Sequence, residues 1–204
     1  MNIYVDFDGT LFNSDLLLSD YIDLLKKYNI SSDTVWDVIN TIFKEEKFNL
    51  FRLTNYINKH YDITGNLSYD LNELFKKNYV YDDVFDSLDI LSKSFNLILL
   101  TYGDYEYQSY KIKVSNLSKY FTNVIITKDR KSSLDINYEK SIFIDNNPNE
   151  ILGYYNSNCT KLIRLRRNDD KYSKINDYVD CVVEFKKFDT ALINKCIEMS
   201  GINE

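Results

Sequence analysis

The sequence predicts an α/β fold in which a Rossmann-like parallel sheet has helices on both faces and an inserted α-helical segment interrupts the chain. Over residues 81–204, short apolar β-rich runs alternate with helical patterns, which is typical of a parallel sheet. A similar run at residues 3–5 stands apart, because residues 14–80 show helical spacing throughout. We therefore predict a core of residues 1–13 and 81–204, with residues 14–80 as an inserted helical domain.

The individual elements follow from the same patterns. Helices are expected over residues 15–25, 35–43, 50–61 and 67–79, where apolar side chains recur on one face, with Ser32 and Asp33 as capping candidates for the second. Later helices are expected over 84–92, 107–117 and 188–199, near Ser133, and from Pro148, which suits a first helical turn. Strands are expected at residues 3–5, 97–101, 124–127, 141–145, 162–165 and 181–183.

The composition argues against several classes of partner. The formal net charge of −6 and the pI of about 4.9 do not favour nucleic acid or an anionic membrane surface, because both attract basic proteins. No apolar run approaches the roughly 18 residues of a membrane span, and the chain begins directly with a strand rather than a signal peptide. The three cysteines are interpreted as buried free thiols, so we expect a cytoplasmic protein.

Polar side chains stand where the apolar strands of the predicted sheet end. Asp6 and Asp8 follow the first strand and Thr101 ends the second; the other candidates are Lys128, Lys131, Asp145 and Asn146. Ligands of parallel α/β sheets bind at the carboxyl ends of the strands, so these groups are expected to converge. Carboxylate and amide oxygens are suited to Mg²⁺, and an ammonium and a hydroxyl are suited to a phosphate.

Each group has a plausible chemical role in phosphoryl transfer. A carboxylate such as Asp6 can attack phosphorus and form an aspartyl-phosphate, which divides hydrolysis into two easier steps. A second carboxylate, Asp8, can protonate the leaving oxygen and then activate water. Thr101, a lysine and backbone amides near Gly103 would stabilise charge on the transferred group.

These residues resemble the signatures of the haloacid dehalogenase-like (HAD) hydrolase superfamily over nearly the whole chain. The segment VDFDGT at residues 5–10 is similar to the family's first signature, which implies Asp6 as nucleophile and Asp8 as general acid/base. The strand ending at Thr101, followed by Tyr102 and Gly103, resembles the phosphate-binding signature. The helical insert resembles the family's type 1 cap, which would close over the site and exclude water.

The last signature departs from its commonest form, because Asn146 stands where Asp is usual. The Asp145-Asn146 ending resembles the branch in which an amide oxygen binds magnesium, so the resemblance implies a metal role for Asn146 and a supporting role for Asp145. The family's lysine is assigned to Lys131, with Lys128 and then Lys140 as competitors. The predicted metal ligands are Asp6, Asp8, Asp145 and Asn146, and the predicted phosphate-binding residues are Thr10, Thr101, Tyr102, Gly103, Lys128 and Lys131.

The resemblance implies a Mg²⁺-dependent phosphatase acting on a small phosphomonoester, since the true dehalogenases lack an acid at the position of Asp8. Two alternatives stay open: a phosphatase acting on a protein or nucleic-acid phosphate, and a catalytically weakened binding or regulatory module. Aromatic residues of the insert, Trp36 among them, are expected in its core, with some facing the substrate. The arginines at 164, 166 and 167 are interpreted as a solvated strand end rather than an anion site.

Overall fold

A parallel sheet forms the centre of the molecule. The computed structural model describes residues 1–44 and 46–201. Its six strands lie in the order β3-β2-β1-β4-β5-β6, and each neighbouring pair is parallel. The predicted Rossmann-like sheet is therefore confirmed. The strands are β1 (Asn2–Val5), β2 (Asn96–Tyr102), β3 (Asn123–Thr127), β4 (Ser141–Asp145), β5 (Leu162–Leu165) and β6 (Val183–Phe185).

The central strands are apolar on both faces because helices cover both faces. β4 and β5 are buried over their full length, whereas β6 at the sheet edge is only partly buried. The prediction for this last strand is wrong by two residues. Pairing with β5 brings Val183–Phe185 into the sheet, in register with residues 163–165, and leaves Cys181 before the strand and exposed. The other two thiols, Cys159 and Cys196, are free and buried as expected.

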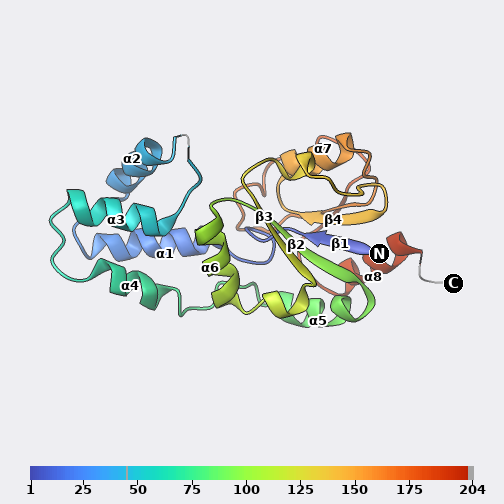
Figure 1. The fold of residues 1–204 in the computed structure, drawn as a ribbon, viewed down its shortest axis with the longest axis horizontal. Helices are drawn as coiled ribbons and strands as arrows, with labels where there is room; N and C mark the ends of the chain where they lie inside the picture. The colour runs from blue at the N-terminus through green and yellow to red at the C-terminus, as the bar shows by residue number, and fades with distance from the viewer. Residues whose placement is uncertain (45, 202–204) are drawn as a thin grey trace.

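Helices flank the sheet on its two sides (Figure 1). On one side, α5 (Val84–Ser94) packs against α8 (Thr190–Ser200), and on the other, α7 (Pro148–Asn156) packs on β4 and β5. Pro148 occupies the first turn of α7, as predicted, and Asn147 caps the helix by accepting from the Asn149 amide at 3.0 Å. The remaining elements of this part are α6 (Tyr105–Ser115), η1 (Ser118–Tyr120) and η2 (Lys131–Ser133).

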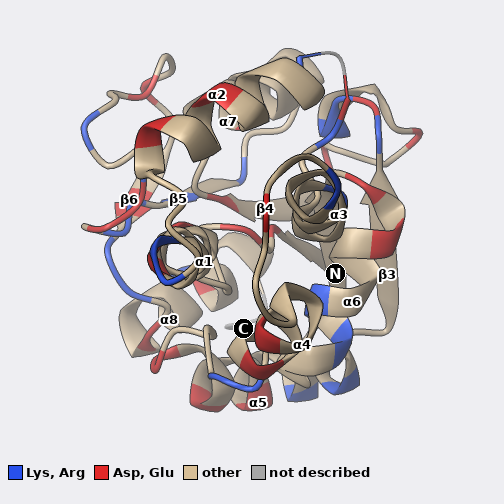
Figure 2. Ribbon diagram, turned by 90° about the vertical axis from the view of Figure 1, so that its left-hand side faces the viewer, with Lys and Arg blue, Asp and Glu red and all other residues tan. Residues whose placement is uncertain are grey.

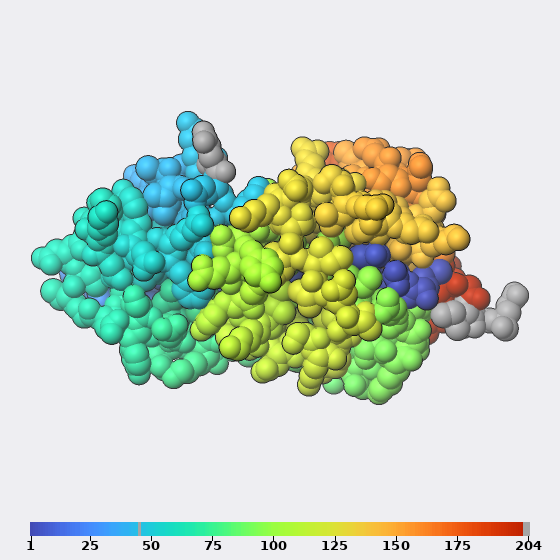
Figure 3. Space-filling view, viewed as in Figure 1, coloured from blue at the N-terminus to red at the C-terminus, as the bar shows by residue number. Residues whose placement is uncertain are grey.

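Four further helices, α1 to α4, lie together beside the sheet, and the outline of the molecule narrows between the two parts (Figures 1 and 3). They are α1 (Ser14–Lys26), α2 (Ser32–Ile42), α3 (Leu50–His60) and α4 (Leu67–Leu74). The second of these is capped by Ser31, which accepts from the Thr34 amide at 3.1 Å, rather than by Ser32 or Asp33. The division into a core and an inserted domain at residues 14 and 80 stays a prediction.

The fourth helix is shorter than predicted, because it ends at Leu74 rather than at residue 79. The Asn13 amide donates to the Tyr79 carbonyl at 2.7 Å, and Phe12 forms an antiparallel bridge with Val80. These contacts hold the chain that leaves β1 beside the chain that returns to α5. Residues 79 and 80 therefore belong to this two-chain connection, which places the start of α1 next to the end of β1.

The charged residues are mixed in the view from the side of α1–α4, where Lys and Arg are interspersed with Asp and Glu (Figure 2). Within residues 1–44 and 46–201, no helix is both long enough and apolar enough to cross a membrane.

Candidate active site

The residues predicted from strand ends do come together at one edge of the sheet. Asp6 follows β1, Thr101 lies in β2, and Asp145 ends β4. The same three side chains line a cavity of about 880 Å³, which also reaches α1 and α2. Parallel neighbours place these strand ends side by side, so the convergence follows directly from the strand order.

A tight turn after β1 sets the position of both aspartates in the DxD segment. The Phe7 carbonyl accepts from the amides of Thr10, Leu11 and Phe12 at 3.3, 2.9 and 2.9 Å. Gly9 has φ of +76°, and a Cβ there would lie 2.1 Å from the side-chain nitrogen Nδ2 of Asn146. Only glycine avoids both the left-handed strain and this overlap. The turn can therefore approach the end of β4 closely.

Asp6 lies on the floor of the cavity with both carboxylate oxygens in contact with donors. One oxygen accepts from Thr10 Oγ1 at 2.9 Å, and the other accepts from Lys131 Nζ. Thr10 is therefore a support for Asp6 in this structure. Burial, followed by the nearby charge of Asp145, raises the pKa of Asp6 to about 7, although the Lys131 ammonium acts in the opposite sense.

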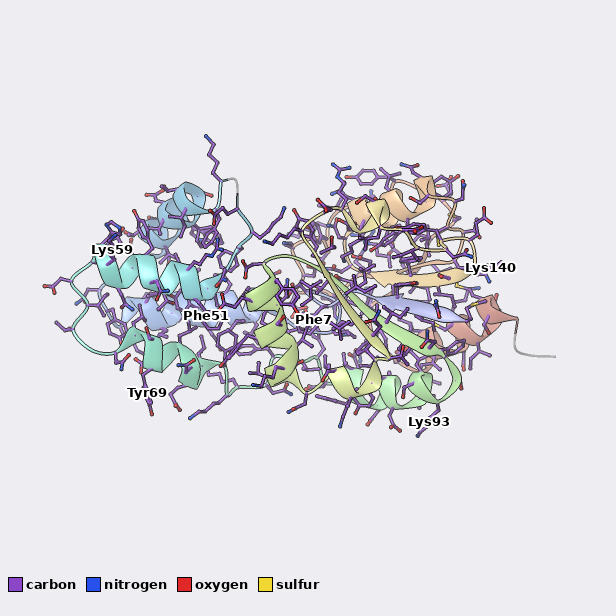
Figure 4. The ribbon with its side chains drawn as sticks, in the orientation of Figure 1. Phe7, Phe51, Lys59, Tyr69, Lys93 and Lys140 are labelled. Carbon is purple, nitrogen blue, oxygen red and sulfur yellow. The ribbon has the colours of Figure 1, made fainter. Side chains whose placement is uncertain are left out.

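The structure distinguishes clearly among the three lysine candidates. Lys131 is 3% exposed, and its ammonium bridges Asp6 and Asp145, the latter at 2.8 Å. Burial alone would lower the pKa of Lys131, but the two carboxylates raise it. Lys128 and Lys140 are exposed and line no part of the cavity. Lys140 lies at the far end of the sheet, well away from Phe7 (Figure 4).

Asp145 is fully engaged within the protein. One oxygen accepts from Lys131 and from the Tyr154 hydroxyl at 3.0 Å, and the other accepts from the Asn147 amide at 2.9 Å. These contacts match the supporting role expected of it, orienting the lysine, better than the predicted role of a metal ligand.

Asp8 has partners that the sequence reasoning missed. Its carboxylate accepts from Ser14 Oγ, from Lys111 Nζ and from Gln108 Nε2, the last at 2.6 Å. Burial would raise the pKa of Asp8, but these donors, Lys111 first, hold it below its ordinary value. Asp8 is therefore held as the carboxylate, which is the form that can accept a proton.

Lys111 is the least expected of these partners, because lysine side chains are rarely buried and this one is only 3% exposed. The ammonium lies over the rings of Phe7, Phe12 and Tyr107, at 5.5, 5.6 and 4.7 Å from their centroids. The available sequence signal is the spacing of Gln108 and Lys111, which places both on one face of the helix after β2. Neither residue stands at a strand end, so the strand-end pattern in the sequence does not mark them as site residues.

Thr101 presents a buried hydroxyl that has no hydrogen-bond partner among the described residues. Its side chain is on the cavity lining and the residue is 1% exposed, so this hydroxyl is a donor available to a bound anion. Gly103 is also predicted to bind phosphate, but its backbone amide already donates to the Thr127 carbonyl at 2.9 Å. Tyr102 is 39% exposed, and the Lys47 ammonium covers its ring.

The donor set at this edge fits a hard cation such as Mg²⁺. Within residues 1–44 and 46–201, no group of three His, Cys, Asp or Glu side chains forms a ready metal cluster. Asp6, Asp8 and Asn146, however, bring carboxylate and amide oxygens to one cavity, and none of the described residues that line it offers a sulfur or imidazole ligand. Oxygen ligands supplemented by water and substrate are the usual environment of Mg²⁺.

Arg164 in β5 and Arg167 just after it form neither an anion site nor a solvated strand end. Arg164 is 0% exposed and donates to the Asn146 carbonyl at 3.3 Å and to Asp177 at 3.0 Å. Arg167 is 5% exposed and donates to both oxygens of Asp83, at 2.7 and 2.8 Å, and to the Thr10 carbonyl. Both interpretations of Arg164 and Arg167 are therefore wrong. The two side chains instead link the backbone next to the site, at Asn146 and Thr10, to Asp177 and Asp83.

Comparisons with known proteins identify the fold. No family model and no curated protein matches the chain. A putative haloacid dehalogenase-like hydrolase from Burkholderia xenovorans is 16% identical, with a TM-score of 0.72, covering 97% of this chain and 96% of that one. A HAD phosphatase from Thermococcus onnurineus is 20% identical, with a TM-score of 0.63 and coverage of 98% and 97%.

A third similar structure is the putative HAD-hydrolase YfnB from Bacillus subtilis, described as bound to magnesium. It is 15% identical, with a TM-score of 0.60, and the match covers 98% of this chain and 97% of that one. Structures of 2-haloacid dehalogenases match as well, so the fold is shared by enzymes that catalyse different reactions. The chain has the fold of the haloacid dehalogenase-like hydrolases.

Proposed function

We propose that this protein is a Mg²⁺-dependent phosphatase that hydrolyses a small phosphomonoester through an aspartyl-phosphate on Asp6. The observation that carries the proposal is the floor of the cavity. There the Asp6 carboxylate, the Lys131 ammonium and the unpartnered Thr101 hydroxyl line one space. A nucleophile beside a cation and a free donor suits a transferred phosphoryl group.

Each side chain has a defined task in this reaction. Asp6 attacks phosphorus, and the bond from phosphorus to the leaving oxygen breaks. Lys131 and Thr101 bind the charged phosphoryl oxygens, while Asp145 and Tyr154 keep the ammonium in place. When bound through Asp6 and Asn146, Mg²⁺ would neutralise charge on the nucleophile and the phosphate.

Asp8 serves both half-reactions. In the first it must take up a proton from solvent and deliver it to the leaving oxygen, and in the second it takes a proton from the water that attacks the aspartyl-phosphate. Lys111, Ser14 and Gln108 hold it in a fixed orientation as the carboxylate, which favours the second task. A carboxylate in this position supports phosphatase chemistry over the dehalogenase chemistry of other proteins with this fold.

The cavity walls favour a small substrate over a macromolecule. Helices α1 and α2 contribute to its lining opposite the strand ends, so a substrate phosphate must enter between the helices and the sheet. The three free thiols suit a reducing compartment, and we propose the cytoplasm.

The test is hydrolysis of phenyl phosphate by the wild type and by Asp6→Asn, each with Mg²⁺ and with EDTA. We expect Mg²⁺-dependent phosphate release by the wild type and a loss larger than about 10⁴-fold in the variant. Asp62→Asn, at an exposed residue outside the cavity, is the matched control and should behave as the wild type. An inert wild type, or full activity in Asp6→Asn, would refute the mechanism and favour a binding module.

A further inference from the structure

The cavity extends well beyond the phosphoryl site, and its outer part has a different lining. A volume of about 880 Å³ accommodates a whole small molecule, of which a phosphoryl group is a minor part. The outer lining includes, among polar side chains, five apolar ones from α1, α2 and the segment before α3: Leu18, Ile22, Trp36, Ile39 and Phe48. We call these five residues the apolar wall.

Most polar side chains that α1 adds to the lining are already satisfied within the protein. Asp23 pairs with Lys26 at 2.7 Å, and Asp15 accepts from the backbone amide of Lys171 at 3.1 Å. Ser14 donates to a carboxylate on the cavity floor. The remaining polar side chains that α1 and α2 bring to the lining are Ser19 and Ser32.

Trp36 is the most exposed member of the apolar wall. It lies on α2, where Val35 and Val38 are buried, yet 45% of its own surface is accessible. An indole ring that lines a cavity with this much free surface offers a flat contact for an apolar ligand. Sugar hydroxyls placed directly against these five apolar side chains would instead be buried without polar partners from the wall itself, which is costly.

We propose that the natural substrate is a phosphomonoester of an alcohol with a flat apolar body, of the aryl type, and that Trp36 is a specificity-determining contact for that body. This inference rests on the proposed phosphatase function for its turnover, but binding at the apolar wall can be measured without turnover.

The binding experiment uses Trp36 as its own reporter, because it is the only tryptophan in the chain. Phenylphosphonate and methylphosphonate carry the same phosphonate group and differ only in the apolar body, and neither is hydrolysed. In the presence of Mg²⁺ we expect phenylphosphonate to change the tryptophan fluorescence and to bind at least about tenfold tighter. Equal affinities, or no fluorescence change on saturation with phenylphosphonate, would overturn the inference.

The turnover experiment compares phenyl phosphate with glucose 6-phosphate for the wild type, Trp36→Ala and Tyr69→Ala. Tyr69 is 57% exposed on α4, outside the cavity and at the outer edge of the helices, so it is the matched control (Figure 4). For Trp36→Ala we expect KM for phenyl phosphate to rise about tenfold with kcat nearly unchanged, and no effect on the sugar phosphate. A wild type that prefers glucose 6-phosphate would overturn the inference.

The two proposals fail in different ways. If phenylphosphonate perturbs Trp36 but no ester is hydrolysed, the phosphatase function is wrong and the apolar wall stands. If both esters are hydrolysed equally well by the wild type and by Trp36→Ala, the phosphatase function stands and the apolar wall is wrong.

A second inference concerns how Asn146 can replace a carboxylate, and a different observation carries it. The Asn146 and Asp170 side chains meet beside Gly9, because Asn146 Nδ2 and Asp170 Oδ1 lie 2.1 and 3.1 Å from the point that a Cβ of Gly9 would occupy. In such a pair the amide N–H₂ is the donor, because a carboxylate only accepts. Asp170 lies in the connection between β5 and β6 and is 4% exposed. Its Oδ2 atom is buried without a hydrogen-bond partner among the described residues.

We infer that Asp170 is a positioning residue for the cation site. By accepting from the amide nitrogen, it fixes the Asn146 side chain and leaves the carbonyl oxygen of the amide available as a ligand. An acidic partner behind a ligand also increases the electron density on the ligand atom. Asp170 would thereby restore part of the negative charge that Asn146 lacks.

The test is Mn²⁺ binding by the metal-free protein, followed by electron paramagnetic resonance, so it does not depend on activity. We expect Asp170→Ala to bind Mn²⁺ roughly 10–100-fold more weakly and the exposed neighbour variant Asp169→Ala to bind as the wild type. In the background of Asn146→Ala, Asp170→Ala should cost no further affinity. Unchanged affinity in Asp170→Ala, or additive losses in the double variant, would overturn the inference.

Discussion

The floor and the apolar wall of the cavity are built in opposite ways. The floor consists of charged groups at strand ends, where Asp6, Asp8 and Asp145 each contact a buried ammonium. The wall consists of apolar side chains from α1, α2 and the segment before α3, with Trp36 partly exposed. The proposed chemistry therefore depends on charged side chains that are held in place by one another, whereas the choice of leaving group depends on apolar side chains that are still accessible to a ligand.

The largest effect should come from the floor. Replacing Lys131 by Met removes the cation that contacts both Asp6 and Asp145, so kcat should fall about 10³-fold for phenyl phosphate and for any other ester that is hydrolysed. Steady-state kinetics on esters with different alcohols would measure it. The matched controls are Lys128→Met and Lys140→Met, which change exposed lysines outside the cavity and should leave kcat unchanged.

A loss confined to one ester would contradict this expectation, because it would make Lys131 part of leaving-group recognition. A loss in Lys128→Met comparable with that in Lys131→Met would return the choice of lysine to an open question. The variant leaves two buried carboxylates without their common partner, which is destabilising. Circular dichroism is therefore needed to verify that Lys131→Met is folded before its kcat is interpreted.

The next largest effect should come from Lys111, which lies under Asp8 rather than at a strand end. Lys111→Met should lower kcat about 10²-fold, because Asp8 loses the donor that orients it and holds its pKa low. The pKa of Asp8 should rise, so the rate that depends on the Asp8 carboxylate should reach its plateau at a higher pH. A pH–rate profile measures this shift, with Lys113→Met, an exposed neighbour on α6, as the control.

An unshifted pH profile in Lys111→Met would assign the rate loss to packing around the aromatic rings instead. Retained activity would show that Ser14 and Gln108 suffice to hold Asp8.

The sequence predicts the floor well, because it is governed by local rules. An apolar strand followed by a polar residue, repeated in a parallel sheet, identifies Asp6, Thr101 and Asp145, and the strand order then brings them together. The burial of Lys131 and the exposure of Lys128 and Lys140 need the structure, because three nearby lysines carry the same local signal.

The remaining parts could not be predicted, since they depend on tertiary contacts. Lys111 and Gln108 face Asp8 from the middle of a helix about 100 residues later, and their spacing places them on one face of that helix without indicating that this face meets Asp8. Asp170 lies in a loop whose course is set by β6, the strand placed two residues too early from sequence. Trp36 fits helical spacing as a core residue does, and only packing leaves it exposed in the cavity.

A smaller effect concerns stability. Because the pKa of Asp6 in the folded protein is raised from 3.8 to about 7, its protonated form stabilises the fold, and this contribution is lost as pH rises through about 7. In the absence of metal, Asp6→Asn should therefore be more stable than the wild type at pH 8, by on the order of a few kcal/mol. Urea unfolding at pH 5 and pH 8 would measure it, and the gain should shrink at pH 5. Equal stability at pH 8 would show that Lys131 compensates Asp6 fully.

The smallest effect should lie in the apolar wall at Phe48, whose ring packs edge-on against Phe43 and Tyr107 with centroids 5.1 and 6.1 Å apart. Phe48→Leu keeps an apolar side chain but removes one aromatic surface, so KM for phenyl phosphate should rise about threefold while kcat stays unchanged. Phe85→Leu, which changes a ring outside this cavity, is the control. A change in kcat would mean that the wall also positions the phosphoryl group, and the separation of chemistry from recognition would then fail. A change in KM alone, small and limited to the aryl ester, is what a wall that contacts only the leaving group requires.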